Sequence, residues 1–300
     1  MSIMRFNYRS QALGHYVDIS VVFPTDEYSY YDISVPRKHH HDMPSLRGKI
    51  KSIYKPGMKF QTVYLIHGGG DDDSLTYRYT NAELYAQRNH VMLVTPNIAN
   101  SFGIDTEYGV PYQTFLTEEL PLVVQTLFAS SPEREDNFIV GYAMGGNVAL
   151  GTALTRPDLY HTCVDISGGI GMTLDTALLK EELDGEHFRN FFYLFNAAFG
   201  ESSNIDNSRL DIYSIAKEHK ERGDELCKFH IACGSEEFIR KRVEGDVRIL
   251  KELGYDVNYI CAEGYDHNFL MWDEYIRAAL DDLLPLKRAA IFPSDSRQEV

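Results

Sequence analysis

The stretch Ile139–Leu150, IVGYAMGGNVAL, has the layout of a β-strand that passes through a sharp turn into a helix. Its glycines match the pattern G-x-S-x-G, the nucleophile elbow, in which small flanking residues permit a tight turn that lifts the central side chain above the sheet. The flanking residues here are Gly141 and Gly145, and the central residue is Ala143. The spacing is therefore that of an elbow, but the hydroxyl group is absent.

Short strand-like runs alternate with helix-like segments on both sides of this turn. The strand-like runs are YVDISVVF, TVYLIHGGG, VMLVTPN, FIVGYAMGG, TCVDISGG, KFHIACGS and VNYICAEG, and the helical patterns include TFLTEELPLVVQTLF and RVEGDVRILKELG. This alternation predicts an α/β domain with a mostly parallel sheet, helices on both faces and ligands at the carboxyl ends of the strands. We expect one domain over residues 1–300, with a Tyr-rich insertion at about 26–60 and a cap-like insertion at about 172–225.

The run YLIHGGG ends one of these strands with three consecutive glycines. Hydrolases with a nucleophile elbow present a backbone N–H group to the developing oxyanion at this place, paired with the N–H of the residue after the nucleophile. We therefore expect Gly69 and Met144 to form an oxyanion hole. His67 and Tyr142, which border the two turns, are expected to contact the substrate.

Two later loops carry acids and a histidine in the order that a hydrolase triad requires. The run ACGSEEFIRKR places Glu236 and Glu237 just after a strand, and AEGYDHNFLMW places His267 just after the next one. We expect His267 to act as general base and then acid, oriented by Glu237 or, alternatively, by Glu236. Trp272 follows on the emerging helix and is expected to line the substrate pocket.

Other groups that could carry chemistry have simpler explanations. The adjacent histidines at 39–41 would point alternately to opposite faces of an extended chain, which is poor geometry for one metal ion, and DDDS at 71–74 fits a polar helix-capping turn. We expect no metal and no cofactor. Four other serines lack an elbow with flanking glycines, and Ser167 is expected to serve a turn: Ser74, Ser101, Ser167 and Ser235.

Charge and hydropathy narrow the range of partners. Lys and Arg number 29 against 44 Asp and Glu, so the formal charge of -15 repels phosphate backbones and anionic headgroups. No apolar run approaches the ~20 residues of a membrane span, and the first residues contain no secretory signal core. We expect a cytoplasmic protein that binds neither nucleic acid nor membrane, with a homo-oligomer left open. Four cysteines beside apolar runs are expected to be buried free thiols: Cys163, Cys227, Cys233 and Cys261.

These stretches, together with MLVTPNIANSFGIDTEYG, TFLTEELP and EGYDHNFLMWDEYI, resemble the putative-esterase family of α/β-hydrolases, which includes tributyrin esterases, esterase D-type enzymes and some feruloyl esterases. The resemblance extends from about Thr62 to Leu284. It implies the α/β-hydrolase fold and a serine carboxylesterase that acts on a small-molecule ester. The family's elbow reads G-x-S-M-G-G, so its serine maps onto Ala143, while its aspartate maps onto Glu237 and its histidine onto His267.

Ala143 removes the nucleophile, so the chain as written cannot form an acyl-enzyme by the family's mechanism. Because the remaining parts are kept, we interpret the chain as an engineered, inactive Ser-to-Ala variant of an active esterase. The alternative is a natural, non-catalytic relative that binds small ligands. The 20 Tyr and 16 Phe residues favour hydroxycinnamoyl, feruloyl or carbohydrate esters, unless they pack the cap instead. Within enzymes, the alternative is an esterase for acetyl or other short aliphatic acyl groups.

Overall fold

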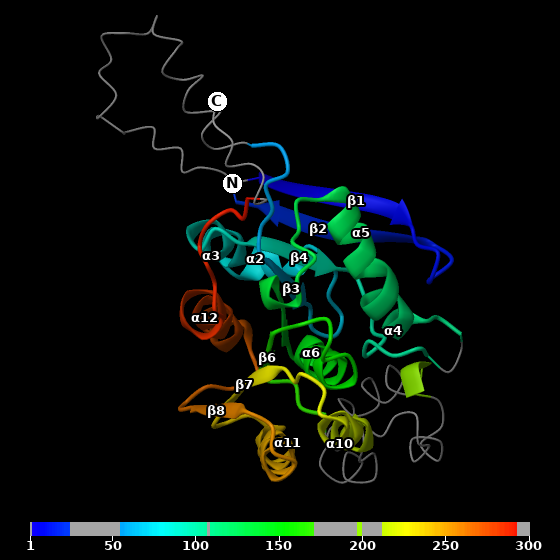
Figure 1. Ribbon diagram of the computed structural model, residues 1–300. Coiled ribbons are helices and arrows are strands. Elements are labelled where there is room, and N and C mark those ends of the chain that lie inside the picture. The colour runs from blue at the N-terminus through cyan, green and yellow to red at the C-terminus, as the bar shows by residue number, and fades with distance from the viewer. Residues whose placement is uncertain (1, 25–54, 107–108, 171–196, 200–211, 293–300) are drawn as a thin grey trace, which may run out of the picture.

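The computed structural model describes residues 2–24, 55–106, 109–170, 197–199 and 212–292 (Figure 1). Eight strands form one sheet in the order β1-β2-β4-β3-β5-β6-β7-β8. β1 and β2 are antiparallel, as are β2 and β4, and the other neighbours are parallel. The strands are β1 (Ser2–Arg9), β2 (Tyr16–Phe23), β3 (Thr62–Ile66), β4 (Met92–Pro96), β5 (Asn137–Tyr142), β6 (Thr162–Ile166), β7 (Lys228–Gly234) and β8 (Val257–Ala262).

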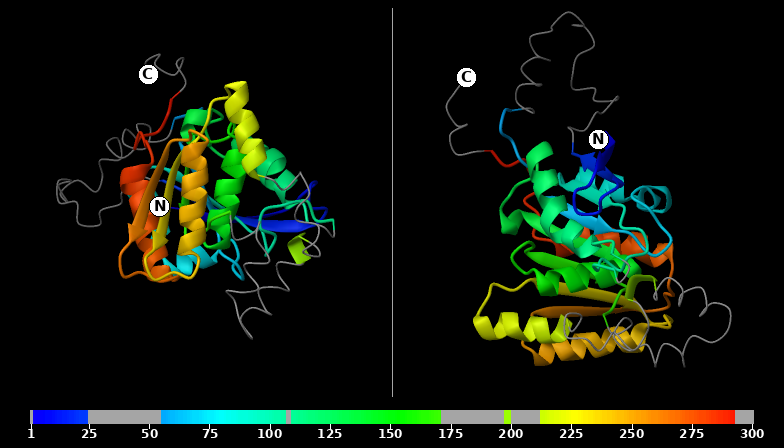
Figure 2. Two further views of the ribbon diagram at one scale, coloured as in Figure 1. Left: turned by 90° about the horizontal axis from the view of Figure 1, so that it is seen from below. Right: turned by 90° about the vertical axis from the view of Figure 1, so that its right-hand side faces the viewer.

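Helices cover both faces of this sheet, as predicted. α5, α6, α10 and α11 pack on one face, and α3 and α12 pack on the other (Figures 1 and 2). The helical elements are α2 (Leu75–Tyr79), α3 (Ala82–Arg88), α4 (Tyr112–Thr114), η2 (Phe115–Glu119), α5 (Leu120–Leu127), η3 (Arg134–Asp136), α6 (Met144–Thr155), α10 (Ile212–Arg222), α11 (Arg240–Glu252), α12 (Phe269–Ala278) and η6 (Ala279–Leu283). The arrangement is the α/β-hydrolase fold.

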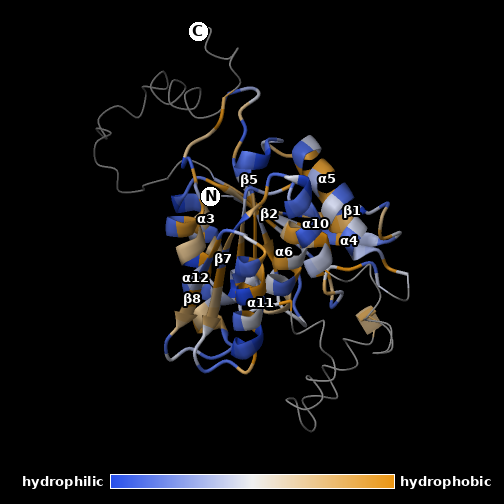
Figure 3. Ribbon diagram, turned by 60° about the horizontal axis from the view of Figure 1, so that its bottom comes forward, coloured by the Kyte–Doolittle hydropathy of each residue, from blue (hydrophilic) through white to orange (hydrophobic). Residues whose placement is uncertain are grey.

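The central strands are apolar on both sides, which explains their continuous hydrophobic sequences. β3, β4, β5 and β6 are buried along their whole length. Side chains alternate between the faces, so Tyr64 and Ile66 enter one core layer while Val63 and Leu65 enter the other. The outer helices are amphipathic, with hydrophobic residues toward the sheet and hydrophilic residues toward the outside (Figure 3).

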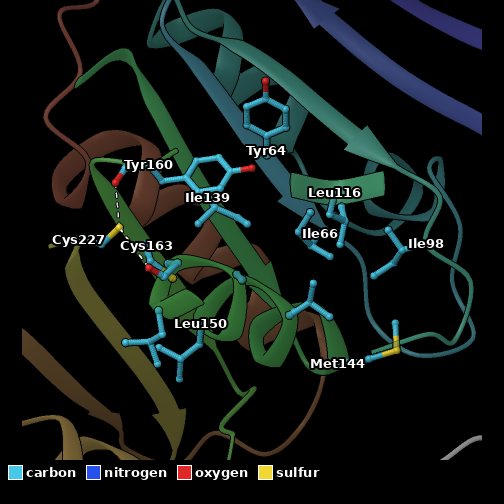
Figure 4. Close-up of a cluster of buried hydrophobic side chains, with 14 of the residues drawn as sticks. Tyr64, Ile66, Ile98, Leu116, Ile139, Met144, Leu150, Tyr160, Cys163 and Cys227 are labelled. Carbon is cyan, nitrogen blue, oxygen red and sulfur yellow. Dashed lines mark hydrogen bonds between the residues drawn. The ribbon is translucent and has the colours of Figure 1, made fainter. Parts of the chain in front are cut away.

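The core layer beneath α6 is packed with large side chains (Figure 4). Tyr64 and Tyr160 meet edge to face, and the Cys227 thiol donates to the Tyr160 carbonyl at 2.8 Å. Cys163 and Cys233 are also free and buried, as expected. Cys261 is free but exposed, which corrects its expected burial, because it belongs to the edge strand β8.

The two predicted insertions lie mostly outside the described residues. Of the second one, residues 197–199 and α10 are described, and α10 packs against α6. Phe199 contacts Phe102 with the ring centroids 5.3 Å apart. The histidines at 39–41 also fall outside the described residues. Among the helices described, none is long and apolar enough to cross a membrane.

Candidate active site

The elbow is formed where β5 meets α6, at the centre of the sheet. Ala143 adopts φ 52° and ψ -125°, a conformation that costs a non-glycine residue about 1–3 kcal/mol. The flanking glycines permit the close approach that this turn requires. A Cβ on Gly141 would lie 2.0 Å from the Gly145 carbonyl oxygen, and a Cβ on Gly145 would lie 2.1 Å from that of Ile66. Side chains at either position would collide with backbone atoms.

The loop after β3 runs beside the elbow, and its two ends are held by side chains. His67 is fully buried, its Nδ1 lies 2.8 Å from the Gly68 carbonyl oxygen, and its Nε2 lies 3.0 Å from the Ile98 amide nitrogen. Burial lowers the pKa of His67, which favours a neutral ring that donates through Nδ1 and accepts through Nε2. The Gly70 N–H donates to Asn100 Oδ1 at 2.6 Å.

Gly69 lies between these two anchors and faces the start of α6. A Cβ on Gly69 would lie 3.9 Å from the Met144 Cβ. Within the described part of the chain, neither the Gly69 N–H nor the Met144 N–H donates a hydrogen bond. Met144 is the first residue of α6, where backbone donors lack partners within the helix and an anion is favoured. The expected pair of oxyanion donors therefore remains available to a ligand.

The loops after β7 and β8 bring an acid and a histidine together. His267 Nδ1 lies 2.7 Å from Glu237 Oε2. The Glu237 side chain is fully buried, and its Oε1 accepts hydrogen bonds from Gly234 N at 2.8 Å and Ser167 Oγ at 2.7 Å. Glu236 is exposed and accepts from the Ser235 hydroxyl instead. Of the two glutamates left open by the sequence, Glu237 is the one that contacts His267.

One cavity of about 400 Å³ connects these parts. It lies at the carboxyl ends of the parallel strands, where ligands were expected. Its wall includes Ala143 and Met144 from the elbow, Gly68–Gly70 from the loop after β3, and His267. Four aromatic side chains also line it, from Phe102, Phe238, Phe269 and Trp272.

Three residues were expected to line the substrate pocket or contact the substrate, and the structure places two of them outside the wall of the cavity. Trp272 lines the cavity, and its Nε1 donates to Ser167 Oγ at 3.2 Å. Tyr142 does not line it, because its ring is buried and stacked on Trp272 with the centroids 5.0 Å apart. His67 is absent from the wall as well, since both ring nitrogens are used within the protein. Tyr142 therefore packs against a residue of the wall, and His67 holds the loop that forms part of it.

A family model described as "Putative esterase" matches residues 50–220. The chain belongs to this esterase family. An acetyl esterase of Caldicellulosiruptor saccharolyticus is 26% identical over 288 residues, which cover 94% of this chain and 97% of that enzyme.

Solved structures of serine hydrolases have the same fold as this family member. FphF, a fluorophosphonate-binding serine hydrolase of Staphylococcus aureus, aligns with a TM-score of 0.71 at 23% identity and covers 93% of this chain and 96% of its own. A Ser-to-Ala mutant of the feruloyl esterase module from Clostridium thermocellum, complexed with sinapinate, aligns with a TM-score of 0.57 at 16% identity. The alignment covers 93% of this chain and 86% of that module.

Three polar residues of this esterase-family site were not predicted as site residues. Ser167 links Trp272 to Glu237, and Asn100 holds the loop after β3. Asp71 lines the cavity, whereas its neighbour Asp72 accepts from the Ser74 N–H and hydroxyl at 2.7 Å. The polar turn expected there is present, but the Ser74 side chain makes no capping hydrogen bond to α2. Each of the three follows a strand of the predicted sheet. This position after a strand is the sequence feature from which they could have been predicted as site residues. In the described ranges, no cluster of three or more His, Cys, Asp or Glu side chains is placed to hold a metal ion.

Proposed function

We propose that this chain has the site of a serine carboxylesterase and binds small-molecule esters, with Ala143 in the position of the nucleophile. The observation that carries the proposal is the His267–Glu237 pair at 2.7 Å, which shares one cavity with the elbow and the loop after β3. Family membership supports ester hydrolysis as the reaction type. The proposed catalytic residues are position 143, His267 and Glu237.

With serine at position 143, each group has a defined task. His267 takes the proton of the serine hydroxyl, whose oxygen then attacks the ester carbonyl. The N–H groups of Gly69 and Met144 stabilise the negative oxygen of the tetrahedral intermediate, while Glu237 holds the imidazole in the required tautomer. His267 returns the proton to the leaving alcohol. Water then attacks the acyl-enzyme with His267 again as base, and the carboxylic acid leaves.

With Ala143 the reaction cannot proceed beyond substrate binding, because a methyl group cannot form an acyl bond. We propose an inactive Ser-to-Ala variant of an active esterase, in which the surrounding site is kept. The Ser-to-Ala feruloyl esterase mutant complexed with sinapinate supports the view that such a substitution is compatible with ligand binding. The second candidate is a natural non-catalytic relative that binds esters without cleaving them, which Ala143 itself favours.

The aromatic wall supports esters with an aromatic acyl group, such as hydroxycinnamoyl esters, including those of carbohydrates. Phe238 and Trp272 flank His267, with ring centroids 5.4 and 5.0 Å from the imidazole, so a planar ring beside the reacting carbonyl could stack there. The similarity to an acetyl esterase favours the alternative of short acyl groups. The proposal also includes a cap formed by residues 172–225 and a cytoplasmic location, and it leaves a homo-oligomer open.

Restoring the hydroxyl tests the proposal. Removal of the catalytic serine from an intact triad costs about 10⁶ in kcat, so Ala143→Ser should accelerate hydrolysis by roughly 10⁴ to 10⁶, equivalent to about 5–8 kcal/mol of barrier. The rates of p-nitrophenyl acetate and methyl ferulate hydrolysis are measured for both proteins, with an acyl burst expected on the activated ester. The ratio of kcat/KM for the two esters separates the aromatic from the short-chain alternative.

The control is the double variant Ala143→Ser/His267→Ala, which keeps the new hydroxyl and removes its base. Its rate should return to that of the parent chain. A folded Ala143→Ser protein that is no faster than its parent on a broad ester panel would favour the non-catalytic binding protein instead.

A further inference from the structure

Asp71 places a carboxylate in the wall of a cavity that is lined mainly by apolar and uncharged residues. Among the lining residues that the structure describes, Asp71 is the one acidic residue, and His267 is the other ionisable side chain. The acid follows directly on the glycine loop that contains Gly69, one of the two proposed oxyanion donors. The position is therefore next to the reacting centre of the proposed esterase and not at a distant rim.

The geometry holds this carboxylate close to the elbow. The buried Tyr142 hydroxyl donates to Asp71 Oδ2 at 3.0 Å, and Thr76 Oγ1 lies 3.1 Å from the same hydroxyl. A Cβ on Gly68 would lie 3.2 Å from Asp71 Oδ2 and 3.4 Å from the Ala143 Cβ. Asp71 and the nucleophile position thus flank the same glycine, separated by the width of one residue.

Among the residues that the structure describes, no cation pairs with this carboxylate. No ion pair to Asp71 is formed by any Lys, Arg or His of the described ranges. Partial burial raises the pKa of Asp71 to about 6, and the hydrogen bond from Tyr142 opposes this rise. The group is consequently ionised at about pH 8 and neutral only in acid.

An unpaired negative charge at this place acts on every ligand that reaches the elbow. It opposes the oxyanion that forms during ester cleavage, and it repels any carboxylate or phosphate carried close to the ester carbonyl. A cationic group there would be attracted. Repulsion of this kind is one way in which a binding site discriminates among ligands.

We propose that Asp71 is a specificity-determining residue that makes the site select esters bearing a positive charge near the carbonyl over neutral ones, and neutral ones over anionic ones. This inference rests on the proposed ester-binding function. It names the ligand class that the site rejects, namely esters with an anionic substituent within a few ångströms of the reacting carbonyl.

Ala143 allows the test to be made as a binding measurement, because the parent chain does not consume the ester. Two isosteric pairs of phenyl acetates serve as probes: 3-acetoxybenzoate against 3-nitrophenyl acetate, and 3-acetoxy-N,N,N-trimethylanilinium against 3-tert-butylphenyl acetate. Calorimetry at about pH 8 gives the Kd of each ester for the parent chain, for Asp71→Asn and for Asp72→Asn. Asp72→Asn is the matched control, since it removes the same formal charge from the adjacent residue, which does not line the cavity.

In the parent chain, 3-acetoxybenzoate should bind more weakly than 3-nitrophenyl acetate. Asp71→Asn should lower the ratio of these two Kd values at least about tenfold and raise the ratio of the ammonium Kd to the tert-butyl Kd by at least the same factor. A unit charge within about 12 Å contributes about 1.4 kcal/mol or more at an effective dielectric constant of about 20, which is a tenfold change in Kd. Asp72→Asn should change each ratio by less than about twofold. Asp71→Ser, which also removes the charge, should reproduce the effect if the Asn variant folds poorly.

Ratios that are the same in the parent chain and in both Asp71 variants would overturn the inference and leave the proposed esterase site intact. Failure of the neutral esters to bind the parent chain, together with an inactive Ala143→Ser protein, would overturn the proposed function and this inference with it.

Discussion

The carboxylate of Glu237 is fully buried, and its oxygens contact three hydrogen-bond donors, from Gly234, Ser167 and His267. Burial of an ionised group is costly unless such donors replace the lost water. Ser167 adopts φ 57°, in the left-handed region that is unfavourable for a residue other than glycine. Its hydroxyl lies between Glu237 and the Trp272 indole, so the strained backbone places a group that orients the acid.

We expect Ser167→Ala, made in the Ala143→Ser protein, to lower kcat by about 10- to 100-fold with little change in KM, because hydrogen bonds to charged groups are worth about 1.5–3 kcal/mol. Steady-state kinetics on p-nitrophenyl acetate measure both constants. Ser167→Gly is the matched control: it also removes the hydroxyl, but glycine tolerates the positive φ. Equal losses of kcat with different melting temperatures identify the hydroxyl as the cause. Losses of kcat that follow the melting temperatures would show a merely structural role.

Helix α6 packs in the core of the fold, and its first residue, Met144, belongs to the candidate active site. Residues Met144–Leu154 are all buried, so the helix lacks a polar face and is enclosed by the protein. Its small residues allow it to lie against β3, β5 and β6. Gly145 marks a close approach, since a Cβ added there would lie 2.1 Å from the Ile66 carbonyl oxygen. The N-terminus of α6 is thereby held beside the loop that follows β3.

Gly145→Ala should destabilise the protein by more than about 3 kcal/mol, because the added methyl group meets backbone atoms that cannot move without separating α6 from the sheet. Urea denaturation monitored by circular dichroism gives the free energy of unfolding. Gly245→Ala in α11 is the control, since its added Cβ meets no atom within 4 Å. That change should stabilise the protein by up to about 1 kcal/mol through helix propensity. Native stability in Gly145→Ala would contradict the close contact between α6 and β3.

At the scale of the whole molecule, the parallel strands end at the same edge of the sheet, and three buried acidic side chains lie near one another there: Asp165, Asp246 and Glu237. Asp165 on β6 is completely buried, accepts from the Gly169 N–H at 3.0 Å through Oδ2, and has no hydrogen-bond partner for Oδ1 within the described ranges. Burial raises its pKa to about 7, and the nearby Asp246 and Glu237 add to the rise. The folded protein therefore binds a proton here more tightly than the unfolded chain.

This proton binding makes the stability of the protein depend on pH. The contribution of Asp165 is present below about pH 4 and is lost as the pH rises through about 7, for a total of about 4 kcal/mol. Asp165→Asn mimics the neutral acid, so it should stabilise the protein more at pH 8 than at pH 6, by about 1 kcal/mol. Urea denaturation of both proteins at the two pH values checks this. An equal effect of the substitution at both values would show that Asp165 does not titrate in the folded state within that range.

The order of strands, helices and functional loops could be predicted from local sequence. YVDISVVF coincides with β2, and the continuous apolar runs became the buried central strands, because burial on both faces requires apolar residues at every position. The elbow, HGGG, the acids and His267 were found by their places after successive strands. β1 was not predicted, since this edge strand is largely exposed and has no apolar run to mark it.

Which side chains meet in the cavity was decided by the tertiary structure alone. The sequence by itself determined that an acid and a histidine follow neighbouring strands, but Glu236 and Glu237 are adjacent, and only the path of the loop after β7 turns Glu237 inward. His67 and Tyr142 border the glycine loop after β3 and the elbow in sequence, yet neither of them lines the cavity. Local patterns report which residues end a strand. The direction of a side chain beyond that end depends on backbone turns and on packing partners that are distant in the chain.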